Sequence, residues 1–175
     1  VWESHPYWLL RPAMLPSMKE SRQSHAAVRY VGDSRQDEPV RVSESIIGEV
    51  STWCDMLGGK GAIQISANTH RRMIVDFETY ICAFNDLITT GGHGAKISLR
   101  WAEALFVVDP ARHKSPRDSL QKENRNEIKG RHFLGYGDTF RPDGGAGRRF
   151  RSLWWGAGRY VEIDVTTADQ PLTIE

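Results

Sequence analysis

The residues of this chain best suited to binding chemistry are aromatic and polar side chains near its C-terminal end. Trp154 and Trp155 are adjacent, and Arg141 and Asp143 precede them in a glycine-rich stretch. Sugars stack their apolar faces on aromatic rings, while carboxylate and guanidinium groups hydrogen-bond to the sugar hydroxyls. These four residues are therefore the candidate carbohydrate-binding residues.

The orientation of the two tryptophans separates a structural role from a binding role. Successive residues of a strand point to opposite faces of a sheet, so we expect one ring to face the core and the other to face solvent. A ring in the core would only stabilise the fold, whereas an outward ring would mark a sugar site or a domain interface. The sugar-site alternative places the outward ring beside Asp143 and Arg141.

Catalytic carboxylates are the next possibility. Glycoside hydrolysis needs two carboxyl groups facing one sugar, with one of them kept protonated as the acid. By residue type alone the candidates are Glu103, Asp138, Asp143, Glu162 and Asp164. Glu103 lies between two alanines in an apolar run, where burial would raise its pKa. A structural ion pair with Arg100 or Arg159 is the alternative that we favour, and we predict no catalytic residue in this chain.

Motifs for metals, cofactors and nucleophiles do not appear. The two cysteines and six histidines form no CxxC or HxxxH pair, and no Gly-x-Ser-x-Gly elbow is present. The three glycine-rich stretches, at 58–61, 91–94 and 144–147, lack the spacing of a phosphate-binding loop and are predicted turns. The sequence therefore predicts no metal site and no cofactor.

The overall composition excludes several classes of partner. A net charge of +1 offers no concentrated basic field for nucleic acid, and no apolar run is long enough to span a membrane. The basic stretch 111–131 is expected to be a solvated loop. Cys54 and Cys82 have apolar neighbours in the sequence, so we expect both to be reduced and to lie in the core, with a disulfide between them as the alternative.

One helix is expected, over residues 43–57. Its apolar side chains recur with helical spacing, Ser43 is placed to cap its start, and Gly58-Gly59 would end it. Residues 1–18 read as an extended lead-in or linker, because three prolines disfavour helix and the apolar side chains between them suit a segment that lies along another surface. Residues 19–175 are assigned to one domain.

Strand patterns dominate from residue 60 onward. Short apolar alternations occur at 63–67, 73–77, 96–101 continuing into 104–108, and 159–165, separated by glycine and proline turns. Period-2 alternation with such turns favours antiparallel pairing, and helices long enough for a parallel sheet are missing between these strands. The predicted fold class is all-β, an antiparallel β-sandwich of supersandwich or jelly-roll-like type with the one short helix.

Several short motifs, taken together in order, carry a family resemblance. They are Gly59-Lys60-Gly61, Val75-Asp76-Phe77, Gly91-Gly92-His93-Gly94-Ala95, Trp101-Ala102-Glu103-Ala104-Leu105, Asn124-Arg125-Asn126, Gly137-Asp138-Thr139-Phe140, Asp143-Gly144-Gly145, Leu153-Trp154-Trp155 and Arg159-Tyr160-Val161. This order resembles the β-sandwich that precedes the catalytic domain in bacterial α-L-rhamnosidases of glycoside hydrolase family 78. The resemblance covers residues 9–175.

The resemblance implies a parent enzyme, and it implies a place for this piece within it. In that family an α/α toroid follows the sandwich and hydrolyses terminal α-L-rhamnose with inversion. Its catalytic motifs are not in this sequence, so the resemblance implies an inactive, non-catalytic domain that braces the toroid of the same chain, whose substrate is a rhamnose-containing glycan. The alternatives are a carbohydrate-binding module that holds sugar by itself and a pure protein-interaction sandwich.

Overall fold

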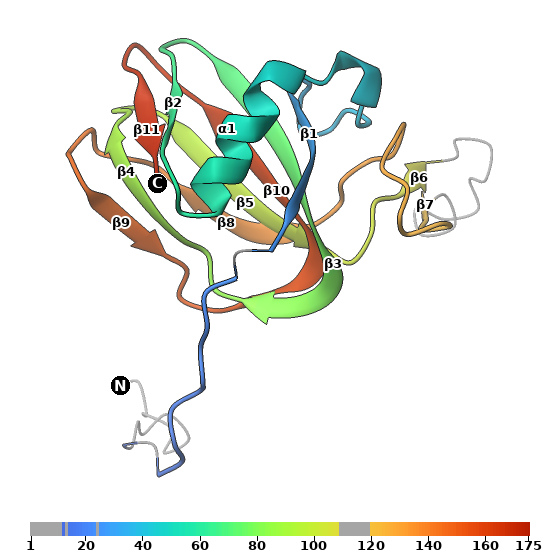
Figure 1. Ribbon diagram of the computed structural model, residues 1–175, viewed down its shortest axis with the longest axis horizontal. Helices are drawn as coiled ribbons and strands as arrows, with labels where there is room; N and C mark the ends of the chain where they lie inside the picture. The colour runs from blue at the N-terminus through green and yellow to red at the C-terminus, as the bar shows by residue number, and fades with distance from the viewer. Residues whose placement is uncertain (1–11, 13, 24, 109–119) are drawn as a thin grey trace, which may run out of the picture.

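A computed structural model describes residues 12, 14–23, 25–108 and 120–175, and it confirms an antiparallel β-sandwich. One sheet has five strands in the order β1-β3-β10-β5-β8, and the other has four in the order β2-β11-β4-β9 (Figure 1). A two-stranded ribbon, β6-β7, stands apart from both. The strands are β1 (Ala27–Gly32), β2 (Ile63–Ile65), β3 (His70–Ala83), β4 (Asp86–Gly91), β5 (Lys96–Ala102), β6 (Val107–Val108), β7 (Leu120–Gln121), β8 (Tyr136–Phe140), β9 (Arg148–Arg151), β10 (Gly156–Thr166) and β11 (Leu172–Ile174).

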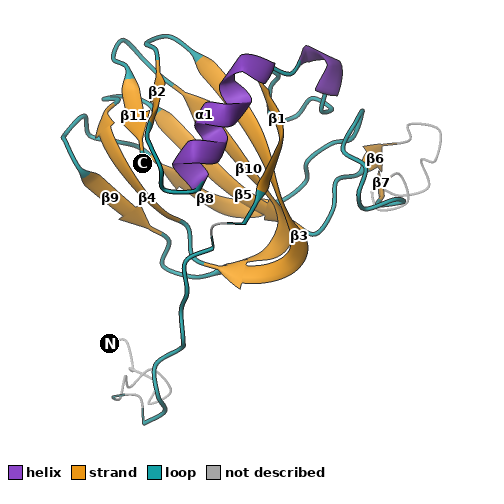
Figure 2. Ribbon diagram, in the orientation of Figure 1, coloured by secondary structure: helices purple, strands orange, loops and turns teal. Residues whose placement is uncertain are grey.

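The predicted helix is present but begins later than expected. Helix α1 (Ile47–Leu57) follows a short 3-10 turn, η2 (Val42–Glu44), and no side chain caps its first turn, so Ser43 does not have the predicted role. Gly58 and Gly59 end the helix as predicted, with Gly59 at a φ of 68°. The helix lies beside β1 and β2, the edge strands of the two sheets, and fills the gap between those edges (Figure 2).

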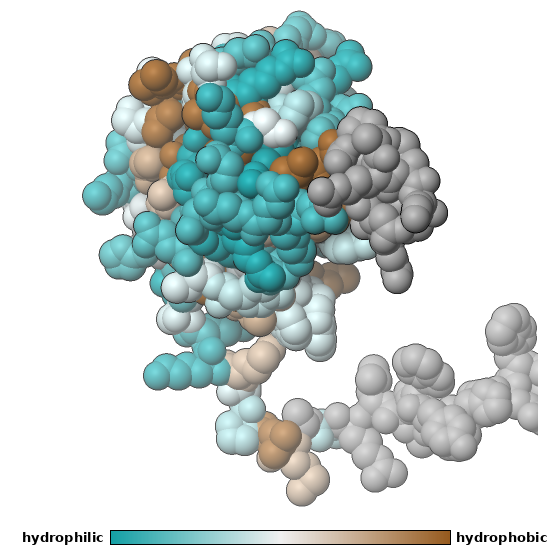
Figure 3. Space-filling model, turned by 90° about the vertical axis from the view of Figure 1, so that its right-hand side faces the viewer, coloured by the Kyte–Doolittle hydropathy of each residue, from teal (hydrophilic) through white to brown (hydrophobic). Residues whose placement is uncertain are grey.

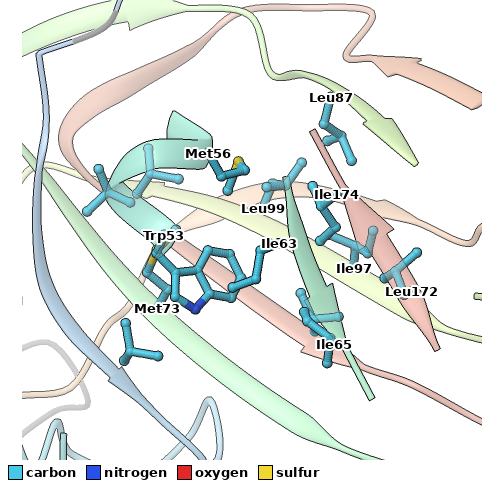
Figure 4. Packing of buried hydrophobic residues seen from close by; sticks show 14 of the residues in the cluster. Trp53, Met56, Ile63, Ile65, Met73, Leu87, Ile97, Leu99, Leu172 and Ile174 are labelled. Atoms are coloured by element: carbon cyan, nitrogen blue, oxygen red, sulfur yellow. The ribbon is translucent and has the colours of Figure 1, made fainter. Parts of the chain in front are cut away.

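The main core lies between the two sheets and under the helix. Trp53 and Met56 from α1 pack with Met73 of β3 and with the inward side chains of β5 and β11 (Figure 4). At the opposite edge, Phe140 of β8 stacks on Phe150 of β9 with 4.9 Å between ring centroids. The apolar residues that alternate along β10 contribute to this core, since Val161 and Val165 are both buried in it.

The outer face of the five-stranded sheet is buried as well. Loops at 33–40 and 122–135 cover it and form a second apolar cluster that contains Tyr30, Ile74, Phe133 and Tyr160. Glu162 is fully buried beside this cluster, where it accepts a hydrogen bond from Arg72 Nε at 2.8 Å and also pairs with Arg100. Strands β1, β3, β10 and β5 of this sheet therefore contribute side chains to a core on each of its faces.

The prediction that both cysteines lie in the core is wrong. Cys54 and Cys82 are exposed and free. In α1 the neighbouring Trp53 takes the buried position, so Cys54 is turned outward by the helical repeat. In β3, Ile81 and Ala83 pack inward, and strand alternation then points Cys82 to the opposite face.

The lead-in does not lie along the sandwich over its described part. Met14, Leu15 and Met18 are exposed. Just after the lead-in, Arg151 Nη2 donates to the carboxylate of Glu20 at 2.6 Å. Figure 1 shows the segment leaving the body at the lower end. Residues 1–11 and 13 of the lead-in lie outside the described residues, as do residues 111–119 of the predicted basic loop. Within the described part, no helix is long and apolar enough to cross a membrane.

Candidate functional site

Exposed aromatic side chains gather at one end of the sandwich, which we call the tryptophan end. It consists of the β3–β4 turn (84–85), the β9–β10 connection (152–155) and Tyr136 at the start of β8. Trp154 is 70% exposed and Trp155 is half-buried, and their rings stack with centroids 5.8 Å apart at an angle of 30°. Neither residue lies in a strand: Trp154 is in a bend and faces solvent, as expected of one of the two rings, whereas Trp155 is only half-buried and does not occupy the expected core position.

A buried asparagine anchors this connection. Asn85 and Ser152 are tied by two hydrogen bonds of 3.0 Å: the Ser152 N–H donates to the Asn85 carbonyl, and the Asn85 N–H donates to Ser152 Oγ. The Asn85 amide accepts from Trp101 Nε1 at 3.0 Å and donates to Asp138 Oδ2 at 3.3 Å. The amide thus bridges β5 and β8 to the turn, and it holds the loop that carries Trp154 in one position.

Aromatic packing below the connection adds to this support. Phe77 stacks on Trp101 with 5.8 Å between ring centroids, and Gly156 lies so close to the Trp101 indole that a Cβ atom there would be 2.3 Å from it. Tyr136, paired with Trp101 across β5 and β8, is 92% exposed, and Leu153 is 97% exposed. Figure 1 shows the β9–β10 connection beside the curled end of β3 at the lower end of the molecule.

The structure does not bring the four predicted binding residues together. Arg141 and Asp143 lie in the β8–β9 turn, whose Gly145 carbonyl accepts a hydrogen bond from Gly91, at the far end of β9 from Trp154. The expectation of an outward ring beside Asp143 is therefore wrong. Asp143 is occupied locally, because the backbone N–H of Gly145 and the side chain of Arg148 hydrogen-bond to it and lower its pKa.

The carboxylates considered as catalytic candidates have structural partners. Lys122 Nζ lies 2.5 Å from Glu103, and Arg125 also pairs with it, so these cations hold the pKa of Glu103 below its usual range. A structural ion pair was the predicted role, but the partners are not the expected Arg100 or Arg159. Asp164 hydrogen-bonds to His70 Nε2 at 2.8 Å and raises the pKa of that imidazole. Among the described residues, no three His, Cys, Asp or Glu side chains are grouped to hold a metal ion.

Sequence reasoning missed two residues of the tryptophan end, Asn85 and Tyr136. Asn85 stands in an Asn-Asp pair between two strands, which is a usual signal for a turn but not for a hub of hydrogen bonds. Tyr136 carries no local signal of exposure, because only the register of β8 against β5 places it at this end.

No protein-family model matches this chain, and no curated protein matches it. Among solved structures it is similar to the CBM32 of AlyQ in complex with 4,5-unsaturated mannuronic acid, with 13% identity and a TM-score of 0.32 over 65% of this chain and 71% of that one. It is also similar to truncated AlyQ with CBM32 and alginate lyase domains, with 12% identity and a TM-score of 0.28 over 65% of this chain and 26% of that one. A fucolectin from striped bass (Morone saxatilis) serum is similar with 13% identity and a TM-score of 0.27, over 68% of this chain and 36% of that one. The chain is therefore assigned to no family.

Proposed function

We propose that this chain is a non-catalytic β-sandwich domain that binds carbohydrate at the tryptophan end. The observation that carries the proposal is the stacked Trp154–Trp155 pair, which presents an exposed ring on an anchored loop. A large aromatic ring in water forgoes the favourable burial that a core position would provide. A pyranose stacked on Trp154 would cover that ring, and its hydroxyls would stay accessible to polar groups and water.

The anchoring through Asn85 favours binding because it lowers the cost of ordering the loop. A site whose loop is already held in its binding conformation loses less conformational entropy when ligand arrives. The hydrogen bonds that link Asn85 to Ser152, Trp101 and Asp138 supply this support from residues outside the ring platform itself. The platform is thus anchored to β5 and β8 of the five-stranded sheet.

Replacing Trp154 by alanine is expected to weaken carbohydrate binding by about tenfold or more, equivalent to about 1.4 kcal/mol, because the exposed ring provides the stacking surface. The measurement is isothermal titration of the domain with a panel of methyl pyranosides that includes α-L-rhamnoside. Leu153→Ala is the matched control, since Leu153 is an even more exposed neighbour on the same loop and offers no aromatic face. Equal affinities for the wild-type domain and Trp154→Ala would exclude this site.

The finer proposal is that the domain belongs to an α-L-rhamnosidase and braces its α/α toroid. It is supported by the motif order described above and by the exposed Met14, Leu15 and Met18 of the lead-in, which suit contact with a neighbouring domain. Hydrolysis of an aryl α-L-rhamnoside by the full-length parent and by this domain tests it directly. We expect an active parent and an inert domain. An inactive parent would remove the rhamnosidase assignment and leave a carbohydrate-binding module or a protein-interaction sandwich.

A further inference from the structure

A second polar cluster lies on the outer face of the five-stranded sheet, where two strands lose their regular register. On β1, Val28 pairs with Val75 and Tyr30 pairs with Ile74, so Arg29 is an extra residue. On β3, residues 77–80 stand opposite Arg159 alone, because Gly158 pairs with Ile81 and Tyr160 pairs with Asp76. Such bulges redirect side chains and are enriched next to functional sites.

Both irregularities direct an arginine to the same buried carboxylate. Asp76, 1% exposed, accepts from Arg29 Nη1 at 2.7 Å and from Arg159 Nε and Nη2 at 2.7 and 2.9 Å. The backbone N–H of Glu78 donates to it at 2.8 Å, and Glu78 has a φ of 63°, which is strained for a residue other than glycine. Burial opposes the charge on Asp76, yet the bonds from Arg159 and Glu78 keep its pKa below the usual range.

Only some of the N–H groups of Arg29 and Arg159 donate hydrogen bonds to Asp76 and Asn126. Arg29 donates otherwise to the Asn126 carbonyl at 3.1 Å, and Arg159 donates to Asn126 Oδ1 at 2.5 Å. A guanidinium has five N–H groups, so both arginines, and the Asn126 amide nitrogen, retain donors without a partner among the described residues. Arg29 remains 36% exposed and Asn126 is exposed, so some of these donors are accessible from solvent.

We propose that Arg29, Arg159 and Asn126 form a second binding site, which takes the carboxylate of an acidic sugar. The unused groups are all donors, and a planar guanidinium held in place matches a carboxylate in bidentate fashion. The two arginines exceed Asp76 by one positive charge, which the exposed Glu78 near Arg159 offsets. The side of the molecule that carries the loop of Asn126 is predominantly hydrophilic, which suits a polar ligand (Figure 3).

Two further carboxylates, those of Glu127 and Glu78, lie near the two arginines. Glu127 Oε1 accepts from the backbone N–H groups of Ile128 and Lys129. Glu78 is exposed on the β3 bulge, and its charge would repel an acidic ligand. Removing that charge should therefore strengthen the binding of an acidic sugar and leave the binding of a neutral sugar unchanged.

The inference rests on the proposed carbohydrate-binding function, and the test separates the two. The domain is titrated calorimetrically with a trisaccharide of galacturonic acid and with the methyl ester of that trisaccharide, which keeps the sugar and removes the charge. We expect the acid form to bind at least tenfold more tightly, Arg29→Gln to abolish that preference, and Glu78→Gln to increase it a few-fold. Arg41→Gln, which removes an exposed arginine that pairs with Glu44, should change nothing.

The outcomes distinguish a binding site from a structural clasp. An unchanged preference for the acid form in folded Arg29→Gln would overturn the proposal, and so would equal affinities for the acid and the ester in the wild-type domain. If Arg29→Gln does not fold, the test uses Glu78→Gln, and an unchanged ratio of the acid and ester affinities in that variant would also overturn the proposal. Because the two sites are separate, Trp154→Ala should weaken the binding of the ester and leave the tighter binding of the acid form at the second site unchanged. A loss confined to Trp154→Ala would support the tryptophan end and contradict the second site.

Discussion

Replacing Glu162 by glutamine is expected to lower the free energy of unfolding by about 3–5 kcal/mol, because it leaves a buried charge without its partner. Arg72 is fully buried, and its Nε donates to Glu162 Oε1 at 2.8 Å. Its Nη1 donates to the carbonyls of Arg35 and Glu38 at 2.8 and 2.9 Å, so the guanidinium also holds the loop that covers the sheet. A neutral amide cannot balance this charge, and the loop would lose its anchor. Urea denaturation followed by tryptophan fluorescence measures the change.

Two further variants separate the buried charge from a general effect of removing an acid. Glu49→Gln removes the carboxylate that pairs with Arg71 at the surface, and we expect a loss of about 1 kcal/mol or less. The double variant Arg72→Met with Glu162→Leu should recover only part of the stability lost by Glu162→Gln, since it removes both charges of the buried pair but leaves Arg100 and the loop carbonyls without these partners. A loss below about 1 kcal/mol for Glu162→Gln would show that Arg72 does not depend on this partner.

Trp53→Ala is expected to lower the free energy of unfolding by about 3–5 kcal/mol, since it opens a large cavity in the main core. Trp53 is fully buried between α1 and the sheets, against Met56, Ile63 and Met73 (Figure 4). The same helix closes the gap between the edge strands β1 and β2, so a cavity beneath it weakens the contact of both sheets with α1. Chemical denaturation of the variant and the wild-type domain gives the difference.

Trp53→Phe is the informative companion, and its expected loss is about 1 kcal/mol or less. Within the described residues, the buried indole N–H of Trp53 has no hydrogen-bond acceptor. Phenylalanine keeps most of the ring and removes that unpaired donor, which offsets the smaller volume. A loss for Trp53→Phe close to that for Trp53→Ala would mean that the indole N–H is satisfied in solution.

Much of the fold follows from local patterns in the sequence. The alternation at 96–101 and 159–165 predicted strands, because period-2 burial is a property of each strand alone. The Gly58-Gly59 pair marked the end of α1, because a positive φ is accessible to glycine at little cost. The start of the helix was predicted less well, since Ser43 has the right chemistry for a cap but lies in the preceding 3-10 turn.

The binding residues depended on contacts that no local pattern contains. The sequence by itself determined that aromatic rings and charged groups occur in turn-rich segments, and that the strands pair antiparallel. Only the tertiary structure decided that Trp154 and Asp143 lie at opposite ends of β9, that Asn85 supports the tryptophan end, and that Arg29 and Arg159 meet Asp76 across 47 and 83 residues of chain. The physical reason is that strand register and bulges set which distant side chains meet, and register is a property of the paired strands rather than of either sequence alone.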